Sequence, residues 1–412
     1  MNNTHQKQTM TFDGLGISPK ILEILKHMRF TSPTPIQHQS IPAGIEGKDI
    51  IGIAQTGTGK TLAFGIPMIQ RLMSGTGQGL ILAPTRELAL QADETFQKIG
   101  RSFGLRTAVL IGGASMNLQI QRIRRHPHII IATPGRLIDH LKQKIVQLNN
   151  IKILVLDEAD RMFDMGFAPQ VKEILKTVPK NRQTMLFSAT MPREILALAT
   201  QNMQMPIRVE VAPAGTAAEL VEQEIFIVRK EDKIRLLEKL LQEYDGSVLV
   251  FSRTKHGAKK ICSSLRGMRH ATAEIHSNRS LFQRREALEG FKSGKYRVLV
   301  ATDIAARGID VSGIEVVVNF DLPDNPEDYI HRIGRTGRAG ISGKAISFAT
   351  PLEQMEIRKI ERLMRKMILR KPLPELPAHR PETKQAEYSE RPRKIAPRQF
   401  GNRIFFPKRR MR

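Results

Sequence analysis

Short apolar runs alternate with stretches of helical periodicity along most of the chain. The first series of expected strands is 50–54, 79–83, 107–111, 128–132, 153–156 and 184–187, and the second is 224–228, 247–251, 272–276, 297–301, 315–319 and 345–348. Runs with little polar alternation are typical of strands that are buried on both faces, and helices between them supply the crossovers of a parallel sheet. The pattern therefore predicts an α/β fold with two tandem parallel-sheet domains.

The alternation is interrupted in two places. Residues 211–218 are mostly small, with Pro213 and Gly215 among them, and are predicted to be a linker between domains at 1–210 and 219–370. Residues 352–369 are amphipathic and predict a closing helix of the second domain. Residues 371–412 are rich in proline and charge without periodicity, which predicts a disordered basic tail with interspersed aromatic rings.

Charge and composition narrow the class of partner. The chain of 412 residues carries 65 Lys and Arg against 40 Asp and Glu, a formal net charge of +25. Such an excess favours a polyanion, either nucleic acid or an anionic membrane surface. Because no run has the length of a signal peptide or a membrane span, we expect nucleic acid, no membrane and a cytoplasmic protein. The single cysteine, Cys262, excludes an intramolecular disulfide and is expected to be an ordinary core or helix residue.

The first expected strand leads into a glycine-rich turn. The sequence Ala54-Gln55-Thr56-Gly57-Thr58-Gly59-Lys60-Thr61 fits the A/G-x-x-x-x-G-K-[ST] phosphate loop and precedes a helical stretch. Glycines allow successive backbone N–H groups to point at an anion, and the helix adds the positive end of its dipole. Lys60 would neutralise the outer phosphates of a nucleoside triphosphate, and the Thr61 hydroxyl would ligate Mg²⁺.

Acidic residues follow the expected strand at 153–156. In an open parallel sheet, ligands bind at the carboxyl ends of the strands. We assign Asp157 to the magnesium ion, directly or through water, as the counterpart of the phosphate loop. Glu158 is then placed to orient or deprotonate the attacking water. A solvated strand end would be the alternative if the phosphate loop were not also present.

These segments together resemble a known family. Asp157-Glu158-Ala159-Asp160, the phosphate loop and Ser188-Ala189-Thr190 make the chain similar to the DEAD-box ATP-dependent RNA helicases of superfamily 2 over residues 10–345. The resemblance implies two tandem RecA-like domains, ATP and Mg²⁺ as cofactors, and RNA as partner. The short basic tail resembles that of bacterial members.

The resemblance also implies roles for individual residues. Gln37 would read the adenine edge, with Phe30 or Phe12 over the base; Arg29 stands where the family usually has glycine, and Ser277 and Asn278 also depart from the family pattern. In the second domain Arg335 and Arg338 would act as arginine fingers, and Asp310 would face the ribose. The implied RNA contacts are Pro84, Thr85, Arg86, Gly113, Thr133, Gly135, Arg136, Arg253 and Thr302, and the implied coupling residues are Asp160, Ser188, Thr190 and His331.

Other interpretations stay open at this point. The Thr and Arg residues in the RNA-contact segments are equally suited to capping helices, and a two-domain motor is also used by DNA translocases. An ATP-gated RNA clamp or annealing factor is a further alternative. We expect an RNA-stimulated ATPase that unwinds or remodels RNA through ATP-driven closure of the two domains, with little sequence preference. Ribosomal particles or the RNA-decay machinery are its possible partners.

Overall fold

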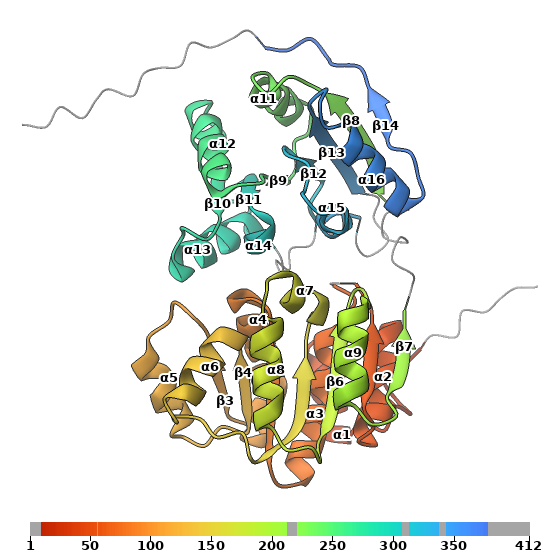
Figure 1. Ribbon diagram of the computed structural model, residues 1–412, viewed down its shortest axis with the longest axis vertical. Coiled ribbons are helices and arrows are strands. Elements are labelled where there is room, and N and C mark those ends of the chain that lie inside the picture. Colours follow the sequence, from red (N-terminus) through yellow and green to blue (C-terminus); the bar gives the residue numbers. More distant parts are fainter. Residues whose placement is uncertain (1–9, 56, 212–220, 307–312, 338–342, 378–412) are drawn as a thin grey trace, which may run out of the picture. The chain divides into compact units, whose positions relative to one another are not determined.

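The computed structural model describes residues 10–55, 57–211, 221–306, 313–337 and 343–377. Within them the chain forms two seven-stranded sheets, and the strand pairs are parallel throughout. The predicted α/β class, with two tandem RecA-like domains, is confirmed. Figure 1 labels the helices and strands that belong to each sheet.

The first sheet has the strand order β3-β4-β2-β5-β6-β1-β7. Its strands are β1 (Ile50–Ile53), β2 (Gln78–Leu82), β3 (Thr107–Leu110), β4 (Ile129–Ala132), β5 (Ile151–Leu156), β6 (Gln183–Ser188) and β7 (Ile207–Glu210). Its helices are α1 (Pro19–His27), α2 (Pro35–Ile45), α3 (Lys60–Ser74), α4 (Arg86–Gly100), α5 (Met116–Ile123), α6 (Pro134–Lys142), α7 (Ala159–Asp164), α8 (Ala168–Thr177) and α9 (Arg193–Asn202).

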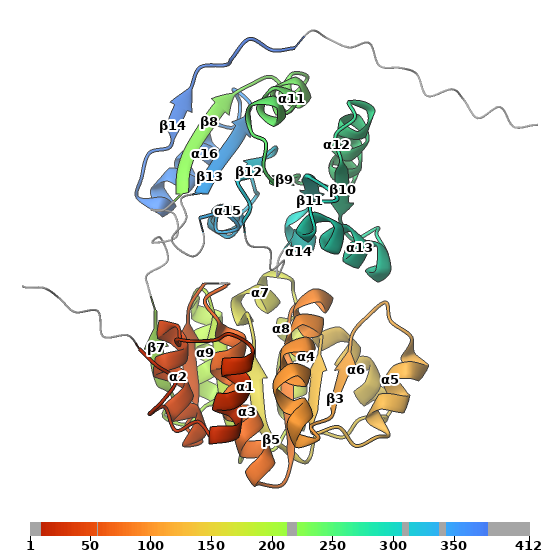
Figure 2. The same cartoon turned by 180° about the vertical axis from the view of Figure 1, so that it is seen from behind.

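Alternate strand residues build a separate core on each face of this sheet. Ile153 and Val155 of β5 pack with α1 to α4, whereas Leu154 and Leu156 pack with α6 to α9. The helices α6, α8 and α9 lie in front of the sheet in Figure 1, and α1, α3 and α4 lie in front in the reverse view of Figure 2. Burial on both faces explains why these strands read as continuous apolar runs.

The second sheet has the order β10-β11-β9-β12-β13-β8-β14. Its strands are β8 (Val221–Ile227), β9 (Val248–Phe251), β10 (Thr272–Ile275), β11 (Val298–Ala301), β12 (Val316–Asn319), β13 (Gly343–Ala349) and β14 (Leu369–Lys371). Its helices are α11 (Lys233–Glu243), α12 (Lys255–Gly267), α13 (Leu281–Lys292), α14 (Asp303–Ala306), α15 (Pro326–Ile333) and α16 (Gln354–Met364). Helices α11 and α12 cover one face, while α13 to α16 cover the other.

The structure corrects one predicted element and adds two. The closing helix does not run to Leu369: α16 ends at Met364, Arg365 takes a left-handed backbone conformation (φ 53°), and the chain then forms β14. Strands β7 and β14 were not expected, because each lies at a sheet edge and lacks a fully apolar run. Leu376 packs against the core of the second sheet, and the tail prediction for 378–412 lies outside the described residues.

Two smaller expectations can also be compared with the structure. Cys262 is 1% exposed on α12, and it is a core residue as predicted. No helix in the described part of the chain is long and apolar enough to span a bilayer. The predicted linker lies in 211–218, of which only Val211 belongs to the described residues.

Candidate functional site

The strand order of the first sheet sorts the candidate residues into two groups. The phosphate loop follows β1, Asp157 and Glu158 follow β5, and Ser188 ends β6, which lies between them. The segments at Thr85, Gly113 and Thr133 follow β2, β3 and β4, which form the other half of the sheet. Since parallel strands end at one edge, the residues predicted to bind the nucleotide and those predicted to contact RNA lie side by side there, in separate halves of the sheet.

The phosphate loop has the backbone geometry that its glycines predict. Gly57 and Gly59 have φ angles of 87° and 89°, a left-handed conformation that glycine adopts without strain. Gly59 is the N-cap of α3, so the N-terminal N–H groups of that helix follow the loop directly. Lys60 is 6% exposed and its Nζ donates to the carbonyl of Ala54, while Thr58 Oγ1 donates to the carbonyl of Gln55.

Gln37 is tied to this loop by its side-chain amide. Its Nε2 donates to the carbonyl of Gly59 (3.0 Å), and its Oε1 accepts the backbone N–H of Thr34 (2.9 Å). A Cβ at residue 59 would lie 2.3 Å from Gln37 Nε2, so only glycine permits this approach. The amide nitrogen and the amide oxygen of Gln37 each keep one further hydrogen-bonding position. An adenine edge requires one such donor and one such acceptor. The sequence predicted that Gln37 contacts the adenine base, but it did not indicate the contact of Gln37 with the phosphate loop.

The two candidate aromatic rings have different surroundings. Phe12 is 5% exposed and belongs to the core beneath α1 to α4, whereas Phe30 is 39% exposed. Arg29, next to Phe30, has a φ of 63°. That left-handed conformation suits glycine and gives a physical reason for glycine at this position in the family.

The acidic pair after β5 is buried. Asp157 and Glu158 are 6% and 4% exposed, and burial raises the pKa of Asp157 above its ordinary range against the pull of Lys60. Burial alone would also raise the pKa of Glu158, but the Arg161 guanidinium, with which it pairs, and Lys60 outweigh it and lower that pKa. Arg161, three residues further along on α7, was not singled out from the sequence.

The acidic strand end also fits the magnesium ion that the resemblance implies. Asp157 Oδ1 is buried without a hydrogen-bond partner among the described residues, a costly state for a carboxylate oxygen unless a cation uses it. Carboxylate and hydroxyl oxygens are the hard ligands that Mg²⁺ prefers. Asp157 and Thr61 are therefore chemically suited to share such an ion with phosphate oxygens.

Asp160 connects the acidic strand end to the segment after β6. Its Oδ2 accepts hydrogen bonds from the N–H of Ala189 (3.0 Å), the N–H of Thr190 (2.8 Å) and Thr190 Oγ1 (3.0 Å). Its own N–H donates to Ser188 Oγ at 3.1 Å. With a side chain 5% exposed, Asp160 satisfies these donors inside the protein and fixes β5 to β6 at the ligand edge.

On the other half of the sheet, Arg86 packs over the glycines that follow β3. A Cβ on Gly113 (φ 75°) would lie 2.1 Å from Arg86 Nη1, so the absence of a side chain there makes room for the guanidinium. Arg136 Nη1 donates to the carbonyl of Ala114 at 3.2 Å. The structure thus gathers Arg86, Gly113 and Arg136 from three separate segments around one short turn.

The neighbouring residues are mixed in character. Thr85 is the N-cap of α4, and its hydroxyl accepts the N–H of Leu88 at 3.3 Å, so it is a helix cap in this structure. Thr133 is the N-cap residue of α6, but its side chain makes no capping hydrogen bond. Pro84 is buried, and a Cβ on Gly135 would meet nothing within 4 Å. Open space over Gly135 leaves the start of α6 accessible to a ligand.

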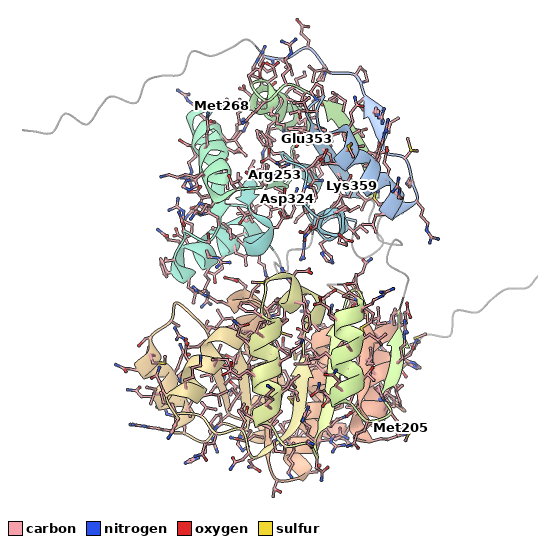
Figure 3. All side chains as sticks on the ribbon, in the orientation of Figure 1. Met205, Arg253, Met268, Asp324, Glu353 and Lys359 are labelled. Atoms are coloured by element: carbon pink, nitrogen blue, oxygen red, sulfur yellow. The ribbon has the colours of Figure 1, made fainter. Side chains whose placement is uncertain are left out.

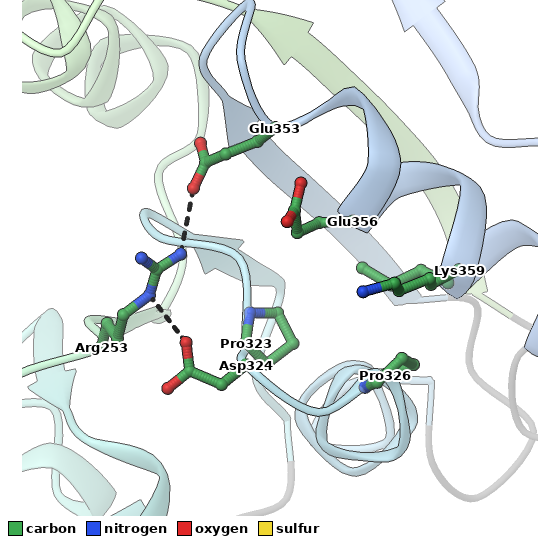
Figure 4. Close-up of a pocket in the computed structure, with 8 residues that line it drawn as sticks. Arg253, Pro323, Asp324, Pro326, Glu353, Glu356 and Lys359 are labelled. Atoms are coloured by element: carbon green, nitrogen blue, oxygen red, sulfur yellow. Dashed lines mark hydrogen bonds and ion pairs between the residues drawn. The ribbon is translucent and has the colours of Figure 1, made fainter.

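In the second sheet, Arg253 lies in a polar depression of about 190 Å³ (Figures 3 and 4). Its guanidinium donates to the carbonyl of Leu322 at 3.1 Å and contacts Asp324 at 3.3 Å and Glu353 at 3.0 Å. Sequence reasoning expected an RNA contact here and did not foresee this network. Thr302 follows β11 and is half-buried, and its backbone carbonyl accepts the N–H groups of Ala305 and Ala306 in the short helix α14.

Arg332 is a residue whose importance sequence reasoning missed. Its guanidinium pairs with both oxygens of Asp303 (2.6 and 2.7 Å), donates to Asp321 and Asn319, and is 1% exposed. It anchors α15, which carries His331, against the ends of β11 and β12.

Arg335 follows α15 and is 3% exposed, and His331 Nδ1 lies 3.9 Å from Asp328. Thr56, Asp310 and Arg338 lie outside the described residues.

Comparisons with known proteins agree with this architecture. Residues 34–198 match the family model described as DEAD/DEAH box helicase, and residues 232–340 match the helicase conserved C-terminal domain. The chain is 43% identical over 375 residues to the ATP-dependent rRNA helicase RRP3 of Debaryomyces hansenii, covering 90% of this chain and 79% of that protein. It is 42% identical over 369 residues to the DEAD-box ATP-dependent RNA helicase CshA of Bacillus cereus, covering 89% of this chain and 70% of that protein.

A solved structure gives the same result. S. cerevisiae Dbp5 bound to RNA and ADP BeF3 superimposes with a TM-score of 0.79 at 31% identity, over 88% of this chain and 96% of that one. The similarity extends across both sheets rather than the first alone.

Proposed function

Because the chain belongs to the DEAD-box ATP-dependent RNA helicases, we propose that it hydrolyses ATP to drive closure of its two domains on single-stranded RNA, which locally unwinds duplexes. The observation that carries this proposal is the Asp160 network, which joins the end of β5 to the segment after β6 by three hydrogen bonds to one oxygen. The relatives named above support RNA as the partner.

On the nucleotide side, the phosphate loop supplies backbone N–H groups and Lys60 supplies charge for the β- and γ-phosphates. When bound, Mg²⁺ would neutralise the developing charge on the phosphate oxygens, and Asp157 and Thr61 would hold it. Glu158, fixed by Arg161, would orient the attacking water or take its proton. Gln37 would add the adenine contact to its hydrogen bond with Gly59.

We assign the arginine fingers to the second domain. Arg335 and Arg338 would approach the γ-phosphate only when the two domains close, and Arg332 would hold Arg335 in place through α15. A finger contributes about 10³–10⁵ in rate, or roughly 4–7 kcal/mol of barrier. The separated first domain should therefore hydrolyse ATP very slowly.

On the RNA side, recognition would run through phosphates. Arg86, Arg136 and the open start of α6 at Gly135 form a cluster of donors suited to phosphate oxygens rather than to base edges. Holding one strand in a bent form would melt a few base pairs, at about 1–2 kcal/mol for each stacking step on the DNA scale. Bound ATP raises the affinity of the protein for RNA, and bound RNA raises its affinity for ATP. Hydrolysis of the ATP releases the RNA.

The partners and the cellular location of the protein are also proposals. The relative from Debaryomyces hansenii is named an rRNA helicase, which supports ribosomal particles as partners, with the RNA-decay machinery as the alternative. We propose a cytoplasmic protein of the bacterial type with a basic tail. Crosslinking and sequencing of the RNA bound in cells would test this assignment.

The test of the mechanism is Glu158→Gln. This change keeps the shape of the side chain but removes its charge, so RNA-stimulated turnover should fall about 10²–10⁴-fold while ATP-dependent RNA binding persists. Glu173→Gln, an exposed change on α8, is the matched control and should leave turnover unchanged. Turnover near the wild-type rate in Glu158→Gln would overturn the role of Glu158. If the duplex stayed intact in strand-displacement assays while annealing proceeded, the alternative function of an ATP-gated RNA clamp or annealing factor would be favoured.

A further inference from the structure

A basic depression lies where the C-terminal end of α16 meets β14, the neighbouring elements at the end of the described chain in Figure 1. It has a volume of about 540 Å³ and five cations line it: Arg358, Arg362, Arg365, Lys366 and Arg370. Arg358 and Arg362 are one helical turn apart and share a face of α16. The left-handed conformation of Arg365 turns the chain back, and β14 brings Arg370 to the same place.

The positive charge of this depression is not neutralised within the fold. Across the described residues, none of the five cations forms an ion pair. The one carboxylate that lines the depression, Glu361, is 6% exposed and accepts the N–H of Ile368 at 3.1 Å. The adjacent Lys371 instead contacts Glu224 at 3.3 Å. The depression therefore carries an excess of positive charge.

The chemistry of the lining favours phosphate over a peptide strand. Four of the five cations are guanidiniums, whose planar donors match phosphate oxygens in pairs. The free edge of β14 is a poor template for another strand, because Pro372 and Pro374 follow it directly and proline has no N–H to donate. An acidic peptide would gain charge contacts but few backbone hydrogen bonds.

We propose that this depression is an auxiliary site for RNA phosphates, which binds the strand beyond the part held by the core. This inference rests on the proposed function. Helix α16 begins next to Glu353, the partner of Arg253, and its 11 residues span roughly 16 Å. At about 3.4 Å of axis per nucleotide of one strand, RNA that passes the predicted contact at Arg253 would reach the site about five nucleotides further along. Short RNAs would therefore miss it and longer RNAs would use it.

The experiment uses the full chain with a non-hydrolysable ATP analogue and labelled single-stranded RNAs of about 6 and about 25 nucleotides, chosen from that spacing. The variant Arg358→Gln/Arg362→Gln/Arg370→Gln should bind the long RNA about tenfold or more weakly, and its salt slope should be less steep by about 2. Binding of the short RNA, ATPase activity at saturating short RNA, and the melting temperature should not change.

A charge-matched control removes three cations outside the unpaired set: Lys98→Gln/Lys239→Gln/Lys371→Gln. Each of these lysines forms an ion pair, Lys98 with Glu94, Lys239 with Glu243 and Lys371 with Glu224. This control should bind both RNAs as the wild type does. An equal loss of long-RNA affinity in both triple variants would show a general charge effect and overturn the site.

Other outcomes separate the alternatives. Unchanged long-RNA affinity and salt slope in the arginine variant would also overturn the proposal. If inorganic tripolyphosphate at matched ionic strength abolished the advantage of the long RNA, and bound the wild type but not the arginine variant, the site would belong to a small polyanion. Failure of the wild type to bind even the short RNA with the analogue would count against the proposed function instead.

Discussion

Asp160 holds Thr190 by two hydrogen bonds to a single carboxylate oxygen, one from the backbone N–H and one from the hydroxyl. The two residues belong to different strand ends of the first sheet, and the bond from Asp160 N–H to Ser188 Oγ completes the connection. A buried carboxylate with several donors fixes its surroundings firmly, because each broken bond would leave a polar group unpaired.

Thr190→Ala should separate ATP hydrolysis from unwinding. It removes the hydroxyl but keeps the backbone bond, so the nucleotide residues stay in place while the segment after β6 loosens by about 1.5–3 kcal/mol. We expect duplex unwinding to fall about tenfold or more, with RNA-stimulated ATPase changing less, measured on the same preparation. Thr200→Ala, which removes an exposed hydroxyl on α9, is the control. A parallel loss of both activities would contradict a coupling role.

Gln37→Glu should weaken ATP binding. The change replaces the Nε2 donor by a carboxylate oxygen facing the carbonyl of Gly59, which turns an attractive contact into a repulsive one. A loss of about 1.5–3 kcal/mol corresponds to roughly 10–100-fold in the dissociation constant of a fluorescent ATP analogue. Gln39→Glu makes the same chemical change at an exposed position of α2 and should have little effect. Equal affinities for the two variants would argue against the loop contact.

Arg332→Ala should destabilise the second domain strongly. It removes a fully buried guanidinium that pairs with Asp303, and it leaves the buried side-chain oxygen of Asn319 without this donor, a change that costs about 3–5 kcal/mol. Urea unfolding should report this loss, and Arg235→Ala, which breaks the more exposed pair with Asp232, should cost under about 1 kcal/mol. Similar costs for the two variants would mean that Arg332 is not an anchor.

Arg29→Gly should stabilise the protein. The left-handed backbone at Arg29 (φ 63°) strains any residue with a Cβ, and relief of that strain should raise the free energy of unfolding by up to about 1 kcal/mol. Thermal unfolding would then shift upward by a few degrees. Lys26→Gly within α1 is the opposite control and should lower stability by about 1 kcal/mol. A lower melting temperature for Arg29→Gly would show that its side chain makes a compensating contact.

Sequence patterns predicted the parts of the fold in which one strand or loop carries its own signal. The strands around Ile153 and Val298 are apolar because both faces are covered, and the glycines before Lys60 specify their own backbone. The edge strands β7 and β14 escaped prediction because an edge needs no continuous apolar run. The end of α16 at Met364 depends on the left-handed turn at Arg365. Neither glycine nor asparagine, which usually mark such a turn, is present at that position.

The same limit applies to the site. The sequence shows an arginine cluster from Arg332 to Arg338, but only the fold reveals that Arg332 is buried against Asp303 and serves as an anchor. Gln37 and Gly59 are far apart in the chain, and their contact depends on how α2 packs beside α3. Such long-range contacts have no local signal, whereas the spacing of the phosphate loop is itself local.

The pairing of β5 with β2 sets the distance over which the two ligand halves of the first sheet must communicate. Neighbouring strands are only about 4.8 Å apart, so a shift of one strand tip is felt by the next without any rearrangement of the core. A rigid scaffold can therefore relay a change as small as the loss of one phosphate, and the sheet itself need not bend.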